Sequence, residues 1–260
     1  MSDSTPAAEG IEPGHFPASP VAAGHVAPCP RRIRGVLDGH TLVDTQHAWY
    51  GWEHPYYPQY LFPEAGVDTA RFSPTGQTTT NALGRFDTFD LDSSDGKQAG
   101  AASRLVEPAG DLPARVWRIE WSALDVWFEE SERVFGHPRS PYSRVDAIRS
   151  DRHVEVRAGG RVIAEADSVV IVFETGLPPR HYFDPTCVNW AALEPTDSQT
   201  VCPYKGVTSG YWCLADDPEG RDIAWSYGFP TPHLQPVAGL VAFYDEVDII
   251  DPGATKAGAP

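Results

Sequence analysis

The sequence predicts an all-β, mainly antiparallel protein made of two tandem copies of one small unit. Two observations carry this prediction. The chain holds 25 prolines and 23 glycines among 260 residues, a composition that favours many turns and few long helices. It also repeats itself internally, with turn dipeptides at matching places, and a repeat of this kind decides the fold before any single element does.

The repeat is clearest where residues 31–67 align without a gap with residues 152–188. Each residue of the first stretch corresponds to the residue 121 positions later, as Gly39 does to Gly160 and Glu53 to Glu174. Chance does not maintain one register over such a length. We therefore interpret the two stretches as copies, the second of which is denser in polar and aromatic candidate site residues.

The repeat and the composition divide the chain into five parts. The Ala, Pro and Gly content of the N-terminal residues predicts a disordered tail without the features of a secretory signal. In the segment between the copies, only the acidic run Glu129–Glu132 is compatible with a short helix. The parts are the N-terminal tail (1–30), the first, degenerate copy (31–128), a linker (129–142), the second, motif-bearing copy (143–251) and a C-terminal tail (252–260).

Each copy is expected to open with a hairpin. The turn dipeptides are Asp38-Gly39 in the first copy and Gly159-Gly160 in the second, and both accept the positive φ angles of a type I′ turn. A more continuous apolar run follows at 48–52 and at 169–173, and each run ends in a glutamate. This pattern is typical of a buried strand that delivers a carboxylate to its end.

Each copy is also expected to close with a hairpin. In the second copy the two apolar runs are 240–244 and 247–250, and in the first they are 117–121 and 124–128. The shift between these pairs is nearer 123 than 121, which indicates small insertions in the middle of the unit.

The charge balance argues against two classes of partner. The chain carries 36 acidic and 20 basic side chains, a net charge of −16, which repels phosphate backbones and anionic membrane surfaces. No apolar run is long enough to span a bilayer. We therefore predict no nucleic acid and no membrane as partner, and the duplicated sheets leave room for a homodimer.

The cysteines give no sign of a metal or redox centre. They are scattered, without the closely spaced pairs of zinc ribbons or redox motifs. We expect a reduced, cytoplasmic setting, with no metal and no cofactor. The four are Cys29, Cys187, Cys202 and Cys213.

Several motifs together resemble one family. They are WEHPYYPQYLFP at 52–63, HPRSPYSRVDAI at 137–148, FETGLPPRHYF at 173–183, CPYKG at 202–206, YW at 211–212, AWSY at 224–227 and GLVAFY at 239–244. In these, and over most of residues 31–251, the chain resembles tandem members of the bacterial domain-of-unknown-function family 427, also catalogued under a nucleotidyltransferase-like name.

The resemblance implies a β-tent-like unit, in which small coiled antiparallel sheets lean together over a cleft. Related folds are pinned by zinc through paired cysteines, which this sequence lacks, so the zinc is not carried over. The catalogued name implies nucleotidyl transfer, although a fold does not fix a reaction.

Glu174 and Lys205 are the leading candidates for catalysis. Glu174 ends a buried strand before a Thr-Gly turn, where it could act as an acid or base, or simply pair with Arg180. Lys205 lies in a Pro-Tyr-Lys-Gly turn, where it could bind an anion, form an imine or remain an exposed turn lysine. The matching stretch of the first copy, 81–85, lacks both this lysine and Cys202.

Cys202 and a set of aromatic residues are further candidates. Cys202 is interpreted either as a nucleophile activated by Lys205 or as a small buried apolar residue. The aromatic rings could wall a ligand pocket or only fill the core. Five lie in the second copy, namely Tyr182, Tyr204, Trp212, Trp225 and Tyr227, and Tyr57 beside Glu53 belongs to a similar cluster in the first.

From these residues we expect the second copy to bind a small molecule in an aromatic-lined cleft and to transform it with Glu174 and Lys205. A non-enzymatic binding or sensing module is one alternative, and nucleotidyl transfer, as the family name implies, is another. A third is a protein-interaction scaffold, but the loss of site residues in only one copy disfavours a symmetric scaffold.

Overall fold

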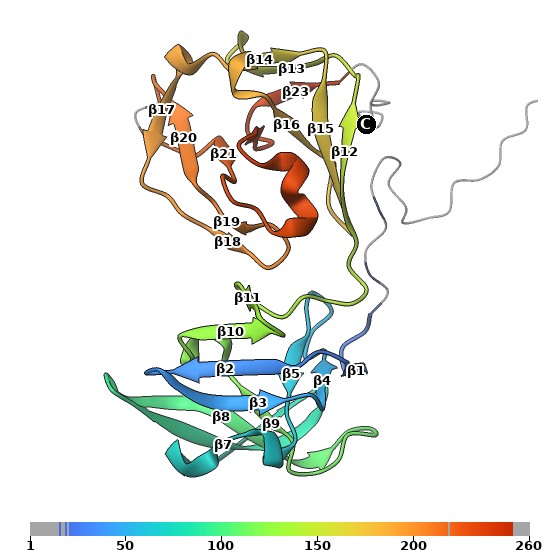
Figure 1. Cartoon of the computed structure of the whole chain (residues 1–260), viewed down its shortest axis with the longest axis vertical. Coiled ribbons are helices and arrows are strands. Elements are labelled where there is room, and N and C mark those ends of the chain that lie inside the picture. Colours follow the sequence, from blue (N-terminus) through green and yellow to red (C-terminus); the bar gives the residue numbers. More distant parts are fainter. Residues whose placement is uncertain (1–15, 17–18, 20, 218, 252–260) are drawn as a thin grey trace, which may run out of the picture. The chain divides into compact units, whose positions relative to one another are not determined.

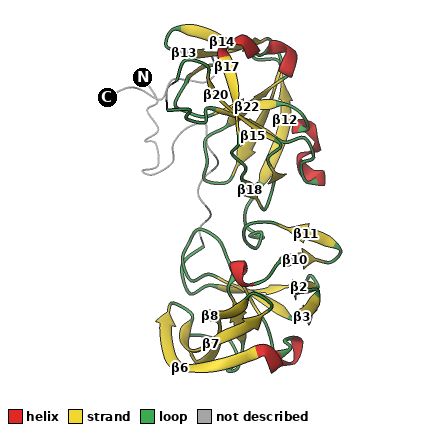
Figure 2. Cartoon of the chain, turned by 90° about the vertical axis from the view of Figure 1, so that its left-hand side faces the viewer, coloured by secondary structure: helices red, strands yellow, loops and turns green. Residues whose placement is uncertain are grey.

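A computed structural model describes residues 16, 19, 21–217 and 219–251, and it confirms an all-β, mainly antiparallel protein. The helical segments within these residues are short 3-10 turns, drawn in red in Figure 2. The chain forms two compact units. Among the described residues, the first unit comprises 21–142, and the second comprises 143–217 and 219–251 together with residues 16 and 19.

The first unit, coloured blue to green in Figure 1, contains two groups of strands. A small sheet has the order β11-β10-β2-β3, and a larger one runs β1-β4-β5, then β9-β8-β7-β6, joined by the bridge between Phe62 and Trp117. The strands are β1 (Val26–Cys29), β2 (Ile33–Leu37), β3 (His40–Thr45), β4 (Ala48–Gly51), β5 (Gln59–Leu61), β6 (Phe72–Asn81), β7 (Gly84–Ser93), β8 (Gly96–Pro108), β9 (Trp117–Ile119), β10 (Val126–Glu129) and β11 (Glu132–Val134).

The second unit, coloured yellow-green to red in Figure 1, has the same plan. Its small sheet is β14-β13-β23, its large sheet is β12-β15-β16-β22-β21-β20-β17, and β18 pairs with β19 in a separate ribbon. The strands are β12 (Val145–Ser150), β13 (Val154–Ala158), β14 (Arg161–Ala166), β15 (Val169–Glu174), β16 (Arg180–Phe183), β17 (Leu193–Thr196), β18 (Val201–Cys202), β19 (Gly206–Val207), β20 (Gly210–Leu214), β21 (Ala224–Ser226), β22 (Val241–Phe243) and β23 (Asp248–Ile250).

The short 3-10 segments also recur between the units. Those after β5 and β16 correspond, as do the two that follow them. These pairs are η1 (Glu64–Gly66) with η4 (Pro185–Cys187) and η2 (Thr69–Arg71) with η5 (Trp190–Ala192). The other two segments do not correspond, because η3 (Trp121–Ala123) follows β9 and η6 (Pro232–Val237) precedes β22.

Backbone irregularities recur at matching positions, which supports the duplication more strongly than the sequence alone. The first hairpin has a register shift between Gly35 and Val36 in one unit and between Val156 and Arg157, 121 residues later, in the other. Both hairpin turns have positive φ at both central residues, 53° and 73° at Asp38-Gly39 and 55° and 79° at Gly159-Gly160. The predicted type I′ turns are therefore present.

Each large sheet buries both of its faces. Neighbouring residues of a strand point to opposite faces, so Tyr60 and Phe62 pack against the small sheet while Leu61 lies on the other side. In the second unit Phe183 packs toward the small sheet and Tyr182 lies opposite. We call these the inner face, which meets the small sheet, and the outer face.

The expectation of a disordered N-terminal tail differs from the structure. Strand β1 lies inside the segment expected to be a disordered tail, and it pairs with β4 in the register that β12 keeps with β15, as Cys29 opposite Ala48 and Ser150 opposite Val169 show. Phe16, also in that segment, bridges to Thr175. Residues 1–15, 17–18, 20 and the expected C-terminal tail at 252–260 lie outside the described residues.

The acidic run Glu129–Glu132 forms the turn of the β10–β11 hairpin and not a helix. Glu130 has a φ of 53°, a left-handed conformation that ends β10 and reverses the chain. Among the described residues, no helix is long and apolar enough to cross a membrane.

The two units fill the space beside the first hairpin differently, and this gives a stability prediction. Gly35 lies opposite Trp127, whereas the corresponding pair in the second unit is Val156 and Ile249. A Cβ atom at Gly35 would lie 2.5 Å from Leu124 and 2.9 Å from Trp127. Gly35→Val should therefore overpack the first unit and lower its free energy of unfolding by about 1–3 kcal/mol, measured by urea denaturation.

Gly110→Ala is the matched control, because a Cβ at Gly110 meets no atom within 4 Å. Equal effects of the two substitutions would contradict the packing explanation.

Candidate functional site

The outer face of the second unit is rich in aromatic side chains. Tyr182 on β16 meets Trp225 on β21 edge to face, with ring centroids 6.3 Å apart. Trp225 packs 4.3 Å from Tyr244, whose hydroxyl lies 3.2 Å from that of Tyr211. Tyr227 belongs to the same buried cluster. Three of the five aromatic candidates, Tyr182, Trp225 and Tyr227, are therefore brought together on one face.

Glu174 and Lys205 form an ion pair at the edge of this cluster. Glu174 is the last residue of β15, as its sequence pattern predicted, and Lys205 lies in the turn between β18 and β19. The lysine Nζ donates a hydrogen bond to Glu174 Oε2. The two side chains are only 13% and 14% exposed, so this pair is largely shielded from water.

The turn that carries Lys205 is fixed from behind by Thr231. The Thr231 N–H donates to the Lys205 carbonyl at 3.0 Å, and its hydroxyl donates to the Tyr204 carbonyl at 2.5 Å. Gly206 completes the turn with a φ of 101°, a conformation that L side chains rarely adopt. The position of the ammonium is thus determined by backbone contacts and not by a free loop.

The surroundings of Lys205 keep it protonated. Burial by itself lowers the pKa of the ammonium, but the nearby Cys202 sulfur and the Glu174 carboxylate outweigh burial, and the net pKa is raised. An amine must lose its proton to form an imine. The geometry therefore favours Lys205 as a hydrogen-bond donor and cation over the imine-forming role considered from the sequence.

Tyr182 brings a second donor to the same place. Its side chain is fully buried beside the Trp225 indole, whose N–H can only donate, and its hydroxyl proton has no acceptor within the part of the chain that the structure describes. Burial raises the pKa of Tyr182 to about 12, with the Lys205 ammonium acting in the opposite direction. At neutral pH the phenol is therefore uncharged. A buried donor without an acceptor is costly, and a ligand oxygen would satisfy it.

The remaining candidates in the second unit have different surroundings. Arg180 does not pair with Glu174: its guanidinium bonds to Asp245 at 2.8 Å and to the Phe243 carbonyl at 2.9 Å, and lies 5.5 Å from the centre of the Trp225 ring. Cys202 is a half-buried free thiol close enough to Lys205 to influence its charge.

Trp212 does not join the outer-face cluster. It packs on the inner face, with its ring 5.1 Å from that of Trp190. Tyr204 is half-buried and holds Thr231 through its carbonyl. A recess of about 460 Å³ does open beside Tyr182, but Glu174, Lys205 and Trp225 lie outside its lining, which includes Arg149, Val170, Tyr182, Asp184, Thr186 and Cys187.

The first unit presents the same outer face with apolar residues. Tyr182 corresponds to Leu61 and Tyr204 to Leu83, each 121 residues apart. Tyr227 corresponds to Leu105, because the carbonyls of both accept a 2.8 Å bond from a residue with positive φ, Gly239 in one unit and Arg115 in the other. Three tyrosines of the second unit thus stand where the first has leucines.

The glutamate at the strand end is present in both units, but its partners are not. Glu53 lies 2.7 Å from Arg118 Nε and accepts a 2.9 Å bond from Asn81, the residue that corresponds to Cys202. Burial raises the pKa of Glu53. Tyr57, the other first-copy candidate, stacks on His137 with centroids 4.2 Å apart, so it belongs to a separate aromatic contact.

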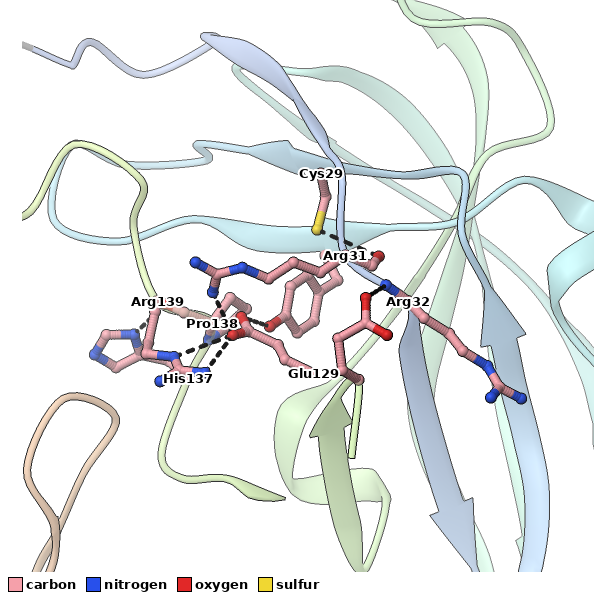
Figure 3. Close-up of polar contacts among 9 residues, drawn as sticks. Cys29, Arg31, Arg32, Glu129, His137, Pro138 and Arg139 are labelled. Carbon is pink, nitrogen blue, oxygen red and sulfur yellow. Dashed lines mark hydrogen bonds and ion pairs between the residues drawn. The ribbon is translucent and has the colours of Figure 1, made fainter. Parts of the chain in front are cut away.

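A second polar cluster, which the sequence did not reveal, lies at the small sheet of the first unit. Glu129 at the end of β10 is 2% exposed. Figure 3 shows Arg31 and Arg139 reaching its carboxylate, to which Arg139 Nε donates at 3.1 Å. The Tyr60 hydroxyl donates to the other oxygen at 2.6 Å. We call Glu129 with Arg31 and Tyr60 the first-unit triad.

The second unit has an equivalent cluster. Arg152 and His181 lie 121 residues after Arg31 and Tyr60, and both contact Asp251, at 3.0 and 3.2 Å. We call these three residues the second-unit triad. The arginines and the ring residues could have been paired from the repeat alignment. The acid could not, because it stands 122 residues after Glu129 and beyond the gap-free stretch.

Comparison with models of known protein families identifies a match in each unit. A family model described as a domain of unknown function (DUF427), with the short name NTP_transf_9, matches residues 25–111 and 146–252. The two matches begin at equivalent positions, 121 residues apart, one in each unit. No curated protein matches the chain. Within the described residues, no group of three or more His, Cys, Asp or Glu side chains is placed to hold a metal ion.

The first-unit triad generates a stability prediction. Glu129→Gln removes the charge that two guanidinium groups share, and a buried ion pair that loses one partner is strongly destabilising. We expect the free energy of unfolding of the first unit to fall by about 3–5 kcal/mol in urea denaturation. Glu107→Gln, which removes an exposed partner of Arg85, should leave stability nearly unchanged. A similar small effect at Glu129 would show that the triad does not anchor the unit.

The second-unit triad predicts a pH dependence. Burial lowers the pKa of His181, with Asp251 acting in the opposite direction, and its Nδ1 atom is enclosed without a partner among the described residues. Because the folded state holds the neutral ring, the unfolded state takes up the proton first. Stability should therefore be full above about pH 6.5, the ordinary histidine value, and fall as the pH is lowered through the depressed pKa.

The checks are an NMR titration of His181 and urea denaturation of the second unit between neutral and acidic pH. His181→Gln keeps a nitrogen near Asp251 but does not titrate, so it should remove this part of the dependence. A His181 pKa above the ordinary value would reverse the predicted sign.

Proposed function

Because the chain belongs to the DUF427 family, a domain of unknown function, we propose a function from its own site: the second unit binds a small carbonyl compound and moves a proton on it with Glu174 and Lys205. The observation that supports this most is the shielded Glu174–Lys205 ion pair beside the Tyr182 hydroxyl, whose proton has no acceptor among the described residues.

The electrostatics favour a neutral ligand. The ammonium and the carboxylate balance each other, so an incoming anion would meet Glu174 as well as Lys205. An uncharged carbonyl oxygen instead accepts hydrogen bonds from Lys205 and Tyr182 without adding charge. Trp225 and Tyr227, which are themselves buried, pack beside these donors as flat apolar rings.

In the proposed step, the Glu174 carboxylate takes a proton from the carbon next to the carbonyl. The electron pair of that C–H bond moves onto the oxygen, where Lys205 and Tyr182 stabilise the developing negative charge. Return of a proton to carbon completes the cycle, so nothing is oxidised or lost. Cys202 has no part in this step and remains a neighbour that helps to keep Lys205 charged.

A second candidate is non-enzymatic binding, which the aromatic outer face favours by itself. In this candidate function Lys205 and Tyr182 still donate hydrogen bonds to the ligand beside the aromatic rings, and Glu174 only positions Lys205. The nucleotidyltransferase-like name of the family stays a label, because no contact described above selects a nucleotide over another ligand.

The test uses 2-butanone in D2O, with NMR detection of deuterium entering the carbons beside its carbonyl. We expect exchange above background that falls at least 100-fold in Glu174→Gln, the contribution typical of a positioned base. Tyr182→Phe should weaken binding about tenfold, the value of one good hydrogen bond. Lys97→Met, at an exposed lysine of the first unit, should change neither.

Saturable binding that depends on Tyr182, without exchange, would establish the binding module instead. If the protein shows no binding and no exchange that depends on Lys205 and Tyr182, the proposed function is overturned.

A further inference from the structure

Three exposed apolar residues lie on segments that adjoin the Glu174–Lys205 pair. Leu177 is 49% exposed, Val201 52% and Phe229 95%. Single exposed apolar residues are ordinary on protein surfaces, whereas a group around one site indicates a ligand or partner contact. Whether these three residues form such a group depends on where their segments lie relative to the ion pair.

Each of the three lies on a segment that also builds the site. The N–H of Leu177 donates to the Glu174 carbonyl at 3.1 Å, in the turn that follows β15. Val201 precedes Cys202 in β18. Phe229 follows Tyr227 by two residues, and its carbonyl lies beside Gly206, next to the lysine. We call Leu177, Val201 and Phe229 the apolar rim.

The segments of the rim lack charge. Residues 175–179, 198–204 and 226–232 contain no Asp, Glu, Lys or Arg, although 22% of the chain is charged. Lys205 directly follows residues 198–204, and its charge is paired with that of Glu174. A surface of this composition favours an apolar chain over a polar or ionic partner.

The first unit shows that this rim is not a general property of the fold. Leu177 corresponds to Tyr56, Val201 to Thr80 and Phe229 to Glu107, by the same shifts that relate the two outer faces. Glu107 is 67% exposed and carries a charge. The apolar rim therefore occurs in the unit that has the tyrosines and Lys205, and is interrupted in the unit that has neither.

We infer that the ligand of the second unit is an amphiphile, an uncharged carbonyl head on an alkyl chain. The head reaches Lys205 and Tyr182, and the chain covers the apolar rim. This inference rests on the proposed function for the position of the head, and it adds the chemical class of the rest of the ligand. It assigns Phe229 as the residue that selects for chain length.

The experiment measures the affinity of straight-chain methyl ketones, from 2-butanone to 2-octanone, by titration calorimetry on the full chain. Each added methylene that leaves water should tighten binding about threefold to fourfold. Octanoate, of similar length but with a charged head, should bind at least tenfold more weakly than 2-octanone. The carboxylate would meet Glu174.

Variants separate the rim from the head. Phe229→Ser and Leu177→Ser should weaken 2-octanone about tenfold and leave 2-butanone unchanged, whereas Tyr56→Ser, at the matching exposed position of the first unit, should affect neither. Phe229 and Leu177 are exposed, so these changes spare the core.

The outcomes distinguish the two proposals. Binding of 2-butanone that depends on Tyr182 but does not tighten with chain length overturns the amphiphile and leaves the proposed function standing. Tightening with chain length that ignores Tyr182→Phe overturns the proposed head site. If Phe229→Ser changes the oligomeric state and not the affinity for ketones, the rim is a protein contact and the inference fails.

Discussion

Each unit is organised around a buried carboxylate that must be neutralised. A carboxylate that is almost completely enclosed, as Glu129 is, persists only with close cationic and hydrogen-bonding partners. Its partners come from the segment before β2 and from β5, so the charge ties the small sheet to the large one. Asp251 imposes the same requirement on the second unit. Because these contacts hold the small sheet against one face of the large sheet, they determine which of its residues lie on the inner face and which on the outer face.

With the inner face fixed by the small sheet, the outer face is where the units diverge. Leu61 and Leu105 belong to an apolar cluster on the first outer face that has no tyrosine among its members. Tyr182 and Tyr227 place phenols at the same backbone positions. The strand-end glutamate persists in both, but Arg118 reaches it from β9 in the first unit, whereas Lys205 reaches it from a turn in the second. The scaffold thus keeps an acid and changes the direction from which the cation approaches.

The parts of this structure that local rules control could be predicted from the sequence. The glycine turns, the buried strand ending in Glu174 and the repeat register depend on neighbouring residues alone. Strand β1 could not, since four residues that include Pro28 show no clear alternation. Glu129 could not, because its partners lie 98 and 69 residues away. For Trp212, the alternation of side chains along the strand predicted that Trp212 and Cys213 point to opposite faces of the sheet, but not which face each takes. The Trp212 ring lies on the inner face because the small sheet packs there.

The closure of each small sheet also bears on how the chain arose. In each small sheet a strand near the start of the unit pairs with one near its end, β2 with β10 and β13 with β23, so the two ends of a unit lie close together. A module with adjoining ends can be copied head to tail without disturbing its interior, since the connection between copies needs to span little distance. The same property makes each unit a natural starting point for circular permutation, with a new opening cut into an exposed turn such as Gly159-Gly160.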